Sequence, residues 1–238
     1  MLIPGTGSDL RREPGPFAWP GAGAFDVVSY DHRGLGRSCA RDPRAQPSMA
    51  DFAADALALA DHLSWQRFAL VGISFGGMVA QELAIAAPER VTRMVLACTS
   101  SGGAGGSSAP LHEVLSLPEA QRAQRLVGLV DARTATDPLL RAQISERLAA
   151  VLVDPDEGAR QQLEARRHHD TFARLGRITA PTLVAAGRHD GLAPLENSRA
   201  LADAIPGARL EVFEGGHAFL DQDPRAWPAV SGFLTAGE

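Results

Sequence analysis

The sequence predicts a single α/β domain organised around a mostly parallel β-sheet. Apolar runs typical of strands alternate with helix-like segments along most of the 238-residue chain, a pattern that requires a parallel sheet with right-handed crossover connections. The run at residues 68–71 is apolar on both faces, as expected for a parallel strand that helices cover on both sides. With 45% hydrophobic residues, a chain of this size can fill one substantial core without disulfides or metal ions.

The predicted elements follow one another in a regular order. Continuous apolar stretches lie at residues 68–71, 94–97 and 183–186, whereas the run at 208–213 alternates between apolar and polar residues. Pro88 ends the helix that follows the third predicted strand. Strands are predicted near residues 1–4, 25–30, 67–72, 92–97, 181–186 and 208–213, and helices near residues 50–63, 76–87, 194–204 and 222–235.

A long insertion separates the last two predicted strands from the others. From about Gly106 to Gly176 the chain is rich in Leu, Ala, Glu and Arg at helical spacing and is punctuated by four prolines. We expect this insertion to form a helical cap over the functional site. The predicted organisation is therefore a core in two parts, residues 1–105 and 177–238, with a cap at residues 106–176.

A glycine-flanked serine joins the third predicted strand to the helix that follows it. Residues 72–76 are Gly-Ile-Ser-Phe-Gly, so Ser74 stands on a sharp turn between a strand and a helix. Such a turn brings backbones so close that side chains two residues away on either side would clash, which explains both glycines. The pattern indicates a nucleophilic serine, and the alternative is a structural serine in a glycine-rich turn.

A nucleophilic serine needs a histidine to take its proton and an acid to orient that histidine. His217 follows the predicted strand at 208–213, and Asp190 follows the strand at 181–186. Both positions lie at the carboxyl end of a strand, where open parallel sheets place their active sites. The order serine, acid, histidine is typical of sites built on a strand-serine-helix turn. We therefore expect Ser74, Asp190 and His217 to form a catalytic triad.

Other residues compete for the acid and base roles. The loop after the strand at 92–97 carries no carboxylate, which favours Asp190 over an acid at that position. His189 adjoins Asp190 but points away from it if the loop is extended. For His217 the alternative is an ordinary histidine of a surface loop. The remaining histidines lie in a turn, on a helix and in the insertion: His32, His62, His112, His168 and His169.

An acyl-transfer site also needs two N–H donors for the oxyanion. The backbone N–H of Phe75, directly after the serine, supplies one donor. The second is expected from the loop after the first parallel strand, residues 3–9, where Thr6 is the candidate. The glycines of that loop permit a close approach of the backbone, and a plain glycine-rich turn is the alternative.

These motifs together resemble those of the α/β-hydrolase superfamily. They are Gly-Ile-Ser-Phe-Gly-Gly at 72–77, Ser-Tyr-Asp-His-Arg-Gly-Leu-Gly-Arg-Ser at 29–38, Gly-Arg-His-Asp at 187–190 and Gly-Gly-His at 215–217. Within the superfamily the chain is most similar to small bacterial serine hydrolases near 3-oxoadipate enol-lactonases and anthracycline methylesterases. The resemblance implies Ser74 as nucleophile, Asp190 as acid, His217 as base, and Phe75 and Thr6 as oxyanion donors.

The chain departs from the family pattern at its start. Members usually open with an antiparallel strand pair and then a His-Gly oxyanion loop, whereas this chain begins Met-Leu-Ile-Pro and carries Pro4 where the histidine stands. We therefore expect the fold to lack that strand pair. The missing histidine removes a hydrogen bond that braces the loop, although the backbone donor at Thr6 remains.

Composition and the absence of certain motifs argue against several classes of function. A formal charge of −5 and a pI near 5.8 argue against an electrostatic nucleic-acid surface. The sequence has no phosphate-binding loop, no dinucleotide fingerprint and no Cys/His spacing typical of zinc, so we expect chemistry without a cofactor or metal. Cys39 and Cys98 are expected as free thiols, and with no apolar run of membrane-spanning length the protein is expected in the cytoplasm, away from membranes.

The expected reaction is hydrolysis of a small carboxylic ester or lactone through an acyl-enzyme. Serine at the turn speaks against dehalogenase or epoxide hydrolase chemistry, for which the same fold uses a carboxylate. Two alternatives remain: a carbon–carbon bond hydrolase, lyase or cofactor-free perhydrolase with the same triad, or a non-catalytic binding protein.

The substrate pocket is expected in the cap. Residues 166–169, Arg-Arg-His-His, could bind a carboxylate-bearing substrate, and the alternative is a helix face exposed to water. Apolar cap residues could line an acyl pocket or pack the cap on itself: Leu111, Leu115, Leu126, Leu129, Val130 and Phe172.

Overall fold

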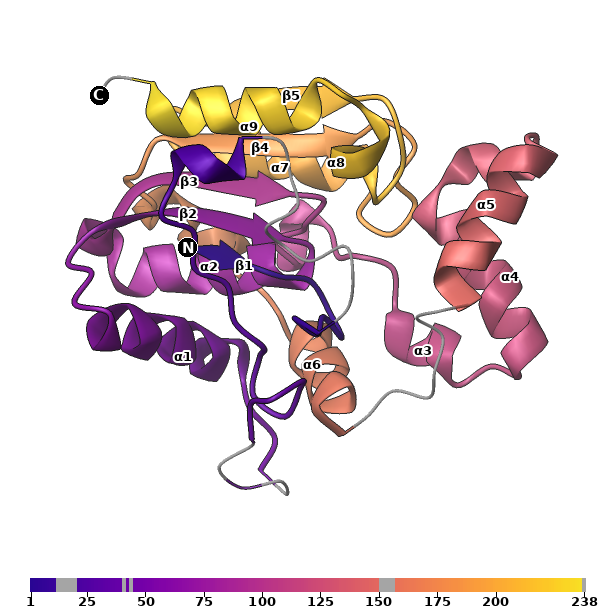
Figure 1. Cartoon of the computed structure of the whole chain (residues 1–238), viewed down its shortest axis with the longest axis horizontal. Coiled ribbons are helices and arrows are strands. Elements are labelled where there is room, and N and C mark those ends of the chain that lie inside the picture. The colour runs from indigo at the N-terminus through magenta and orange to yellow at the C-terminus, as the bar shows by residue number, and fades with distance from the viewer. Residues whose placement is uncertain (12–20, 40–41, 43–44, 150–156, 237–238) are drawn as a thin grey trace.

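The computed structural model of the chain describes residues 1–11, 21–39, 42, 45–149 and 157–236. In this part of the chain, five strands form one parallel sheet in the order β1-β2-β3-β4-β5 (Figure 1). The predicted mostly parallel sheet is confirmed. The strands are β1 (Leu2–Ile3), β2 (Phe68–Ile73), β3 (Val91–Ala97), β4 (Thr182–Gly187) and β5 (Arg209–Phe213).

Helices connect the strands and cover both faces of the sheet. The longer ones are α1 (Met49–His62), α2 (Phe75–Ala86), α4 (Glu119–Val130), α5 (Pro138–Ala149), α6 (Glu157–Arg167), α7 (Leu195–Ala204) and α9 (Ala226–Thr235). The shorter ones are α3 (Leu111–Leu115) and α8 (Phe219–Gln222). Single 3₁₀ turns are η1 (Ala22–Ala24), η2 (Pro88–Arg90), η3 (Gly103–Gly105), η4 (Ala132–Ala135) and η5 (Phe172–Arg177).

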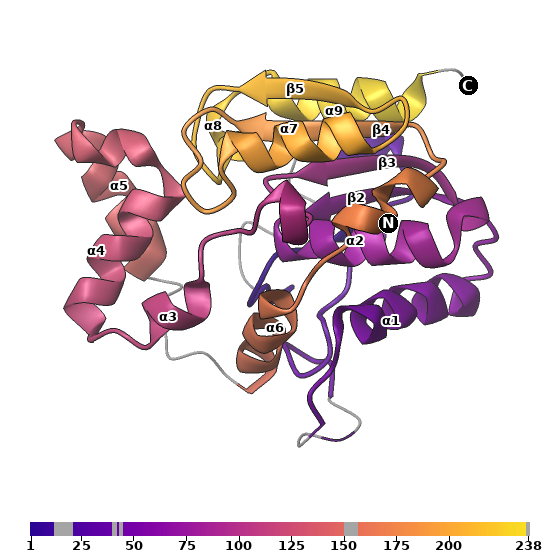
Figure 2. The same ribbon diagram turned by 180° about the vertical axis from the view of Figure 1, so that it is seen from behind.

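The core consists of two apolar layers, one on each face of the sheet. The larger layer packs α1, α2 and α7 against the sheet, and the smaller one packs α8 and α9 against the opposite face (Figures 1 and 2). Consecutive residues of a strand enter opposite layers: Val95 faces α9, while Leu96 faces α2. Both are 0% exposed, which accounts for the continuously apolar strands of the sequence.

Two predicted elements are wrong in detail. Residues 25–30 are not a strand, because β1 beside them has only two residues and a single backbone bond, from Leu2 N to Val28 O at 2.8 Å, joins the segments. The predicted helix at 222–235 is instead split between α8 and α9. Pro224 forces Asp223 into an extended conformation, with φ −109° and ψ 115°.

The insertion between β3 and β4 lies at the carboxyl end of the sheet, where the strand arrows point toward α3, α4 and α5 (Figure 1). Its last part returns to the core: Thr171 Oγ1 donates to Gln81 Oε1 at 2.6 Å, and Arg174 pairs with Glu82 at 2.7 Å. Whether residues 106–176 act as one cap stays a prediction. Within the described residues, no helix has the length and apolar character needed to cross a membrane.

Replacing Leu96 by Ala tests the packing of the central strand. Leu96 is 0% exposed and lies between Gly72 of β2 and Val184 of β4. We expect a loss of about 2–5 kcal/mol in the free energy of unfolding, because the change leaves a cavity. The matched change Leu139→Ala removes a side chain that is 78% exposed and should cost less than about 0.5 kcal/mol. Urea denaturation measures both, and equal effects would contradict this packing.

Candidate active site

Ser74 occupies a strained turn between β2 and α2. Its backbone has φ 55° and ψ −116°, a conformation that side chains rarely adopt outside sites that require it. Two neighbours from β3 and the loop after it hold the turn: Ser74 N donates to Ala97 O at 2.8 Å, and Thr99 Oγ1 donates to Ser74 O at 2.8 Å. The hydroxyl therefore projects from the carboxyl edge of the sheet.

Both glycines that flank this turn are sterically required. A Cβ on Gly72 would lie 2.5 Å from Gly76 O, and a Cβ on Gly76 would lie 2.0 Å from Ile3 O. In both positions the obstacle is backbone, which cannot move aside as a flexible side chain can. The clash predicted two residues on either side of Ser74 is thus present, and β1 packs directly against the start of α2.

His217 lies between Ser74 and Asp190 and contacts both. His217 Nε2 is 3.0 Å from Ser74 Oγ, and His217 Nδ1 is 2.8 Å from Asp190 Oδ2. A carboxylate only accepts hydrogen bonds, so Nδ1 carries the proton of the neutral ring, and Nε2 is left to accept from the serine hydroxyl. The structure therefore brings together the three residues that the sequence predicted as a triad.

Asp190 is held rigidly. Its side chain is 1% exposed, compared with 19% for His217. One carboxylate oxygen, Oδ1, accepts from the backbone N–H groups of Leu192 at 2.8 Å and Ala193 at 2.9 Å. The other oxygen is therefore free to orient His217.

The end of α4, in the insertion, braces the loops that carry the acid and the histidine. Leu129 O accepts from Gly191 N at 2.9 Å, and Val130 O accepts from His217 N at 2.7 Å. One of these two consecutive carbonyl groups holds Gly191, which is next to Asp190, and the other holds His217 itself. The insertion is consequently part of the structure that positions the site.

A second bond network supports the same loop. Gln222 accepts from Gly216 N at 2.7 Å and donates to Asp131 Oδ2 at 3.2 Å. Although burial alone raises the pKa of Asp131, hydrogen bonds from Arg133 outweigh it and hold this pKa below its usual value. Asp131 thus stays ionised and fixes Gln222 under the histidine loop. Nothing in the sequence pattern indicated these two residues.

The other histidines have partners or surroundings away from Ser74. His189 Nε2 lies 3.4 Å from Glu214 Oε2, so it points away from Asp190, as expected for an extended loop. His168 contacts Glu164 at 3.0 Å and His112 contacts Glu113 at 3.7 Å, each within the insertion. His62 is exposed near the end of α1.

His32 braces the loop expected to contain the second oxyanion donor. It is 0% exposed, and its Nε2 lies 3.1 Å from the carbonyl oxygen of Pro4, which can only accept. The ring packs edge-on against Phe52 and Phe75. Desolvation lowers the pKa of His32 to about 4, so the ring is neutral and donates from Nε2. His32 thus braces this loop with a hydrogen bond, although the sequence analysis expected the loop to lack such a bond.

The oxyanion candidates lie on the two segments next to Ser74. Phe75 is the first residue of α2, so its N–H has no acceptor within the helix. Gly5 lies against the serine, since a Cβ on it would be 3.5 Å from Ser74 Cβ. Thr6 follows, and its buried Oγ1 has no hydrogen-bond partner among the described residues. The oxyanion roles of Phe75 and Thr6 stay predictions.

Gln162 of α6 is a site neighbour that the sequence analysis missed. Its Oε1 accepts from Gly7 N at 2.8 Å, which ties the insertion to the loop beside Ser74. Its side chain is fully buried, and its Nε2 has no partner among the described residues. The sequence did contain one indication of this role. Gln162 lies four residues before Arg166, and residues four apart share one face of a helix.

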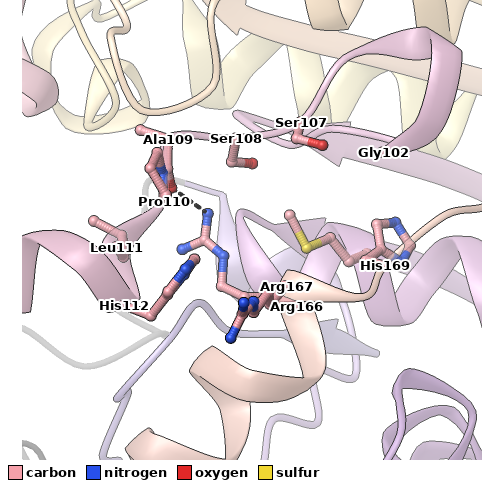
Figure 3. A pocket seen from close by; sticks show the side chains of 11 residues that line it. Gly102, Ser107, Ser108, Ala109, Pro110, Leu111, His112, Arg166, Arg167 and His169 are labelled. Atoms are coloured by element: carbon pink, nitrogen blue, oxygen red, sulfur yellow. Dashed lines mark hydrogen bonds between the residues drawn. The ribbon is translucent and has the colours of Figure 1, made fainter.

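A cavity of about 110 Å³ lies beside this helix face. Figure 3 shows Arg166 and His169 along one side of it and Ser107, Ser108 and Ala109 along the other. Met78 of α2 also lines the cavity. Arg166, Arg167 and His169 line the cavity, and Arg167 and His168 are also exposed to water. Whether residues 166–169 bind a carboxylate stays a prediction. Leu111 is among the lining residues, which is consistent with the alternative that apolar cap residues line a pocket. Within the described part of the chain, no three His, Cys, Asp or Glu side chains gather closely enough to hold a metal ion.

Comparisons with known proteins identify relatives of this chain. A family model described as "Serine aminopeptidase, S33" matches residues 17–223. The chain is 36% identical over 221 residues to the "Putative carbamate hydrolase RutD" of Pseudomonas syringae pv. syringae, covering 89% of this chain and 84% of that protein. It is 32% identical over 256 residues to the "Rhodomycin D methylesterase DauP" of Streptomyces sp. (strain C5), covering 92% and 84% respectively.

The fold is also similar to the crystal structure of the enol-lactonase from Burkholderia xenovorans LB400. The TM-score is 0.75 and the identity 26%, and the match covers 98% of this chain and 90% of the lactonase. A methylesterase of the anthracycline type and an enol-lactonase were the two kinds of relative predicted from the motifs. That predicted resemblance is confirmed.

A Gly76→Ala variant tests the close packing behind the serine. Its Cβ would meet the backbone of Ile3 at 2.0 Å, so we expect a loss of about 1–3 kcal/mol or more in the free energy of unfolding. Gly232→Ala in α9 is the matched control, because its added Cβ meets nothing within 4 Å and should stabilise the helix by about 0.5–1 kcal/mol. Thermal unfolding distinguishes them, and a Gly76→Ala protein as stable as wild type would contradict the contact.

The buried neutral His32 makes stability depend on pH. Its folded pKa of about 4 lies below the ordinary 6.5, so below pH 6.5 the unfolded chain binds a proton that the folded chain does not. The free energy of unfolding should therefore fall between pH 7.5 and 5, with His32 contributing on the order of 1–2 kcal/mol. His32→Gln keeps a donor for Pro4 O and should reduce this loss, whereas the exposed control His62→Gln should not. Urea denaturation at both pH values measures this loss of stability. If His32→Gln loses as much stability as wild type between pH 7.5 and 5, His32 is not the buried neutral group responsible.

Proposed function

The chain belongs to the α/β-hydrolase superfamily, in the family described as serine aminopeptidase S33, and we propose that it hydrolyses a carboxylic ester or a lactone. The observation that carries the proposal is the continuous hydrogen-bonded chain from Asp190 through His217 to Ser74. These contacts, at 2.8 and 3.0 Å, are within the range that nucleophilic catalysis by serine requires.

In the first step His217 Nε2 takes the proton of Ser74 as Oγ attacks the carbonyl carbon of the substrate. The negative charge that develops on the carbonyl oxygen is stabilised by the backbone N–H groups of Phe75 and Thr6. His217 then gives its proton to the departing alkoxide oxygen. An ester releases an alcohol at this stage, whereas a lactone opens and keeps its hydroxyl on the acyl group.

In the second step water hydrolyses the acyl-enzyme. His217 takes a proton from the water as its oxygen attacks the ester carbonyl on Ser74, and the same oxyanion donors stabilise the intermediate. Return of the proton to Ser74 Oγ releases the carboxylic acid and restores the free enzyme. Throughout both steps Asp190 keeps His217 in the required tautomer and stabilises its charged form.

Support for an ester or lactone comes from the relatives. The names of two proteins similar to this chain describe a methylesterase and an enol-lactonase. A carbamate is the second candidate substrate, because the chain is 36% identical to a relative whose name describes a carbamate hydrolase. All three substrates have an acyl carbon open to attack by the serine. A panel of esters, lactones and carbamates, with products identified, distinguishes among them.

Single and double substitutions test whether the triad residues act together. Ser74→Ala and His217→Ala should each lower kcat for ester hydrolysis by a factor on the order of 10⁴ or more, and the double variant should be scarcely worse. The controls Ser145→Ala and His62→Ala change exposed residues of α5 and α1 and should keep wild-type turnover. If the two losses in kcat instead multiply in the double variant, the triad assignment is wrong.

A further inference from the structure

The cavity beside α6 lies between the insertion and the core and is partly open. Its lining comes from α6 and the segment after it, from the loop that follows β3, and from α3 (Figure 3). Met78 of α2 completes it. At about 110 Å³ it is smaller than the cavity of about 150 Å³ that admits benzene. It has room for a small polar group with a short carbon chain.

Arg166 points into this cavity without a carboxylate to balance it. Its hydrogen bond among the described residues is a long one, from Nη2 to the carbonyl oxygen of Ala109 at 3.4 Å (Figure 3). The other arginines of α6 do have acidic partners: Arg160 pairs with Glu157 at 3.4 Å, and Arg167 approaches Glu164 at 3.9 Å. Burial without a counter-charge lowers the pKa of Arg166 to about 10.

An unpaired charge in such a place is unfavourable unless something compensates it. A guanidinium group presents a planar fork of N–H donors that matches a carboxylate. Here these donors find one backbone carbonyl at the limit of hydrogen-bond distance. Arg166 is therefore matched to an anion that enters the cavity rather than to a partner within the described chain.

A second buried group in the cavity lacks partners as well. His169 is 6% exposed, and neither of its ring nitrogens has a hydrogen-bond partner of ordinary geometry among the described residues. The backbone of Ser100 lies near enough to favour the charged ring, but desolvation is the larger effect and lowers the pKa of His169 to about 4. The neutral ring can donate one hydrogen bond to a ligand. The hydroxyl of Ser108, which is bonded to Ser100 Oγ at 2.8 Å, lines the opposite side.

The cavity lies close to the reacting serine along two separate elements. On α2, Met78 is one helical turn after Ser74, and its N–H approaches Ser74 O at 3.3 Å. On α6, Gln162 bonds to Gly7 beside the serine loop, and Arg166 follows one turn later. Four residues of an α-helix span about 6 Å. At Met78 the cavity lining is therefore one helical turn from Ser74.

We propose that this cavity binds a carboxylate of the substrate through Arg166, so that the enzyme selects esters or lactones that carry a free carboxylate a few carbon atoms from the scissile carbonyl. This inference rests on the proposed ester or lactone hydrolysis. A carboxylate fits better than a phosphate, because the cavity is small and the guanidinium of half-buried Arg166 balances a single negative charge, whereas Arg167, which also lines the cavity, already approaches Glu164. His169 and Ser108 provide further hydrogen bonds to the same group.

Two substrates of similar length test the selection. Hydrogen methyl adipate carries a carboxylate at its far end, whereas methyl hexanoate ends in a methyl group. Wild type should show the higher kcat/KM for the adipate ester. In Arg166→Gln the ratio of the two kcat/KM values should fall roughly ten- to hundredfold, the effect of removing one charged partner from a buried hydrogen-bonded pair.

Arg160→Gln is the matched control. It removes the same charge from the same helix, but at an exposed position outside the cavity lining, so the ratio should stay at its wild-type value. Arg166→Lys keeps the charge without the fork and should give an intermediate ratio. An unchanged ratio in Arg166→Gln, or a wild-type enzyme that prefers methyl hexanoate, overturns the proposal.

A binding measurement separates this inference from the proposed reaction. Calorimetric titration of glutarate into Ser74→Ala protein requires no turnover. We expect glutarate to bind, and to bind at least tenfold more weakly when Arg166→Gln is added. If this holds while no ester is hydrolysed by wild type, the anion site stands and the proposed function fails. If wild type hydrolyses esters but glutarate binding does not depend on Arg166, the carboxylate site is wrong.

Discussion

The close packing of three backbone segments around Ser74 is the constraint on which the site depends. The serine adopts a left-handed conformation that is stable only because its surroundings enforce it. Gly72 and Gly76 allow β1, β2 and the first turn of α2 to approach within distances that no side chain would permit. Because β1 is so close, its following loop passes directly beside the serine. Ser74 and the loop expected to stabilise the oxyanion are therefore positioned by one and the same contact.

The insertion is a structural partner of this site. Carbonyl groups at the end of α4 hold the loops of Asp190 and His217, while Gln162 of α6 holds the loop beside Ser74. A rearrangement of the insertion would consequently change the geometry of Ser74, Asp190 and His217. Arg166 lies on the same face of α6 as Gln162, so one helix links the serine loop to the proposed carboxylate site.

Much of the core of the site could be predicted from the sequence, because its determinants are local. A serine between two glycines, and an acid and a histidine that each follow an apolar strand, specify positions at one edge of a parallel sheet. The brace from His32 to Pro4 and the contacts of Gln162 could not be predicted in this way. They join residues far apart in the sequence, and their geometry depends on how the insertion folds back. The missing strand at 25–30 has a similar cause, since a strand needs a long enough neighbour to pair with.

The most direct test of this account is intact-mass spectrometry after exposure of the folded protein to a fluorophosphonate, which reacts with activated serines. The account predicts one adduct per chain, located at Ser74 by peptide mapping and absent from Ser74→Ala. An adduct that persists in Ser74→Ala, or folded wild-type protein that acquires none, would contradict the claim that His217 and Asp190 activate this serine.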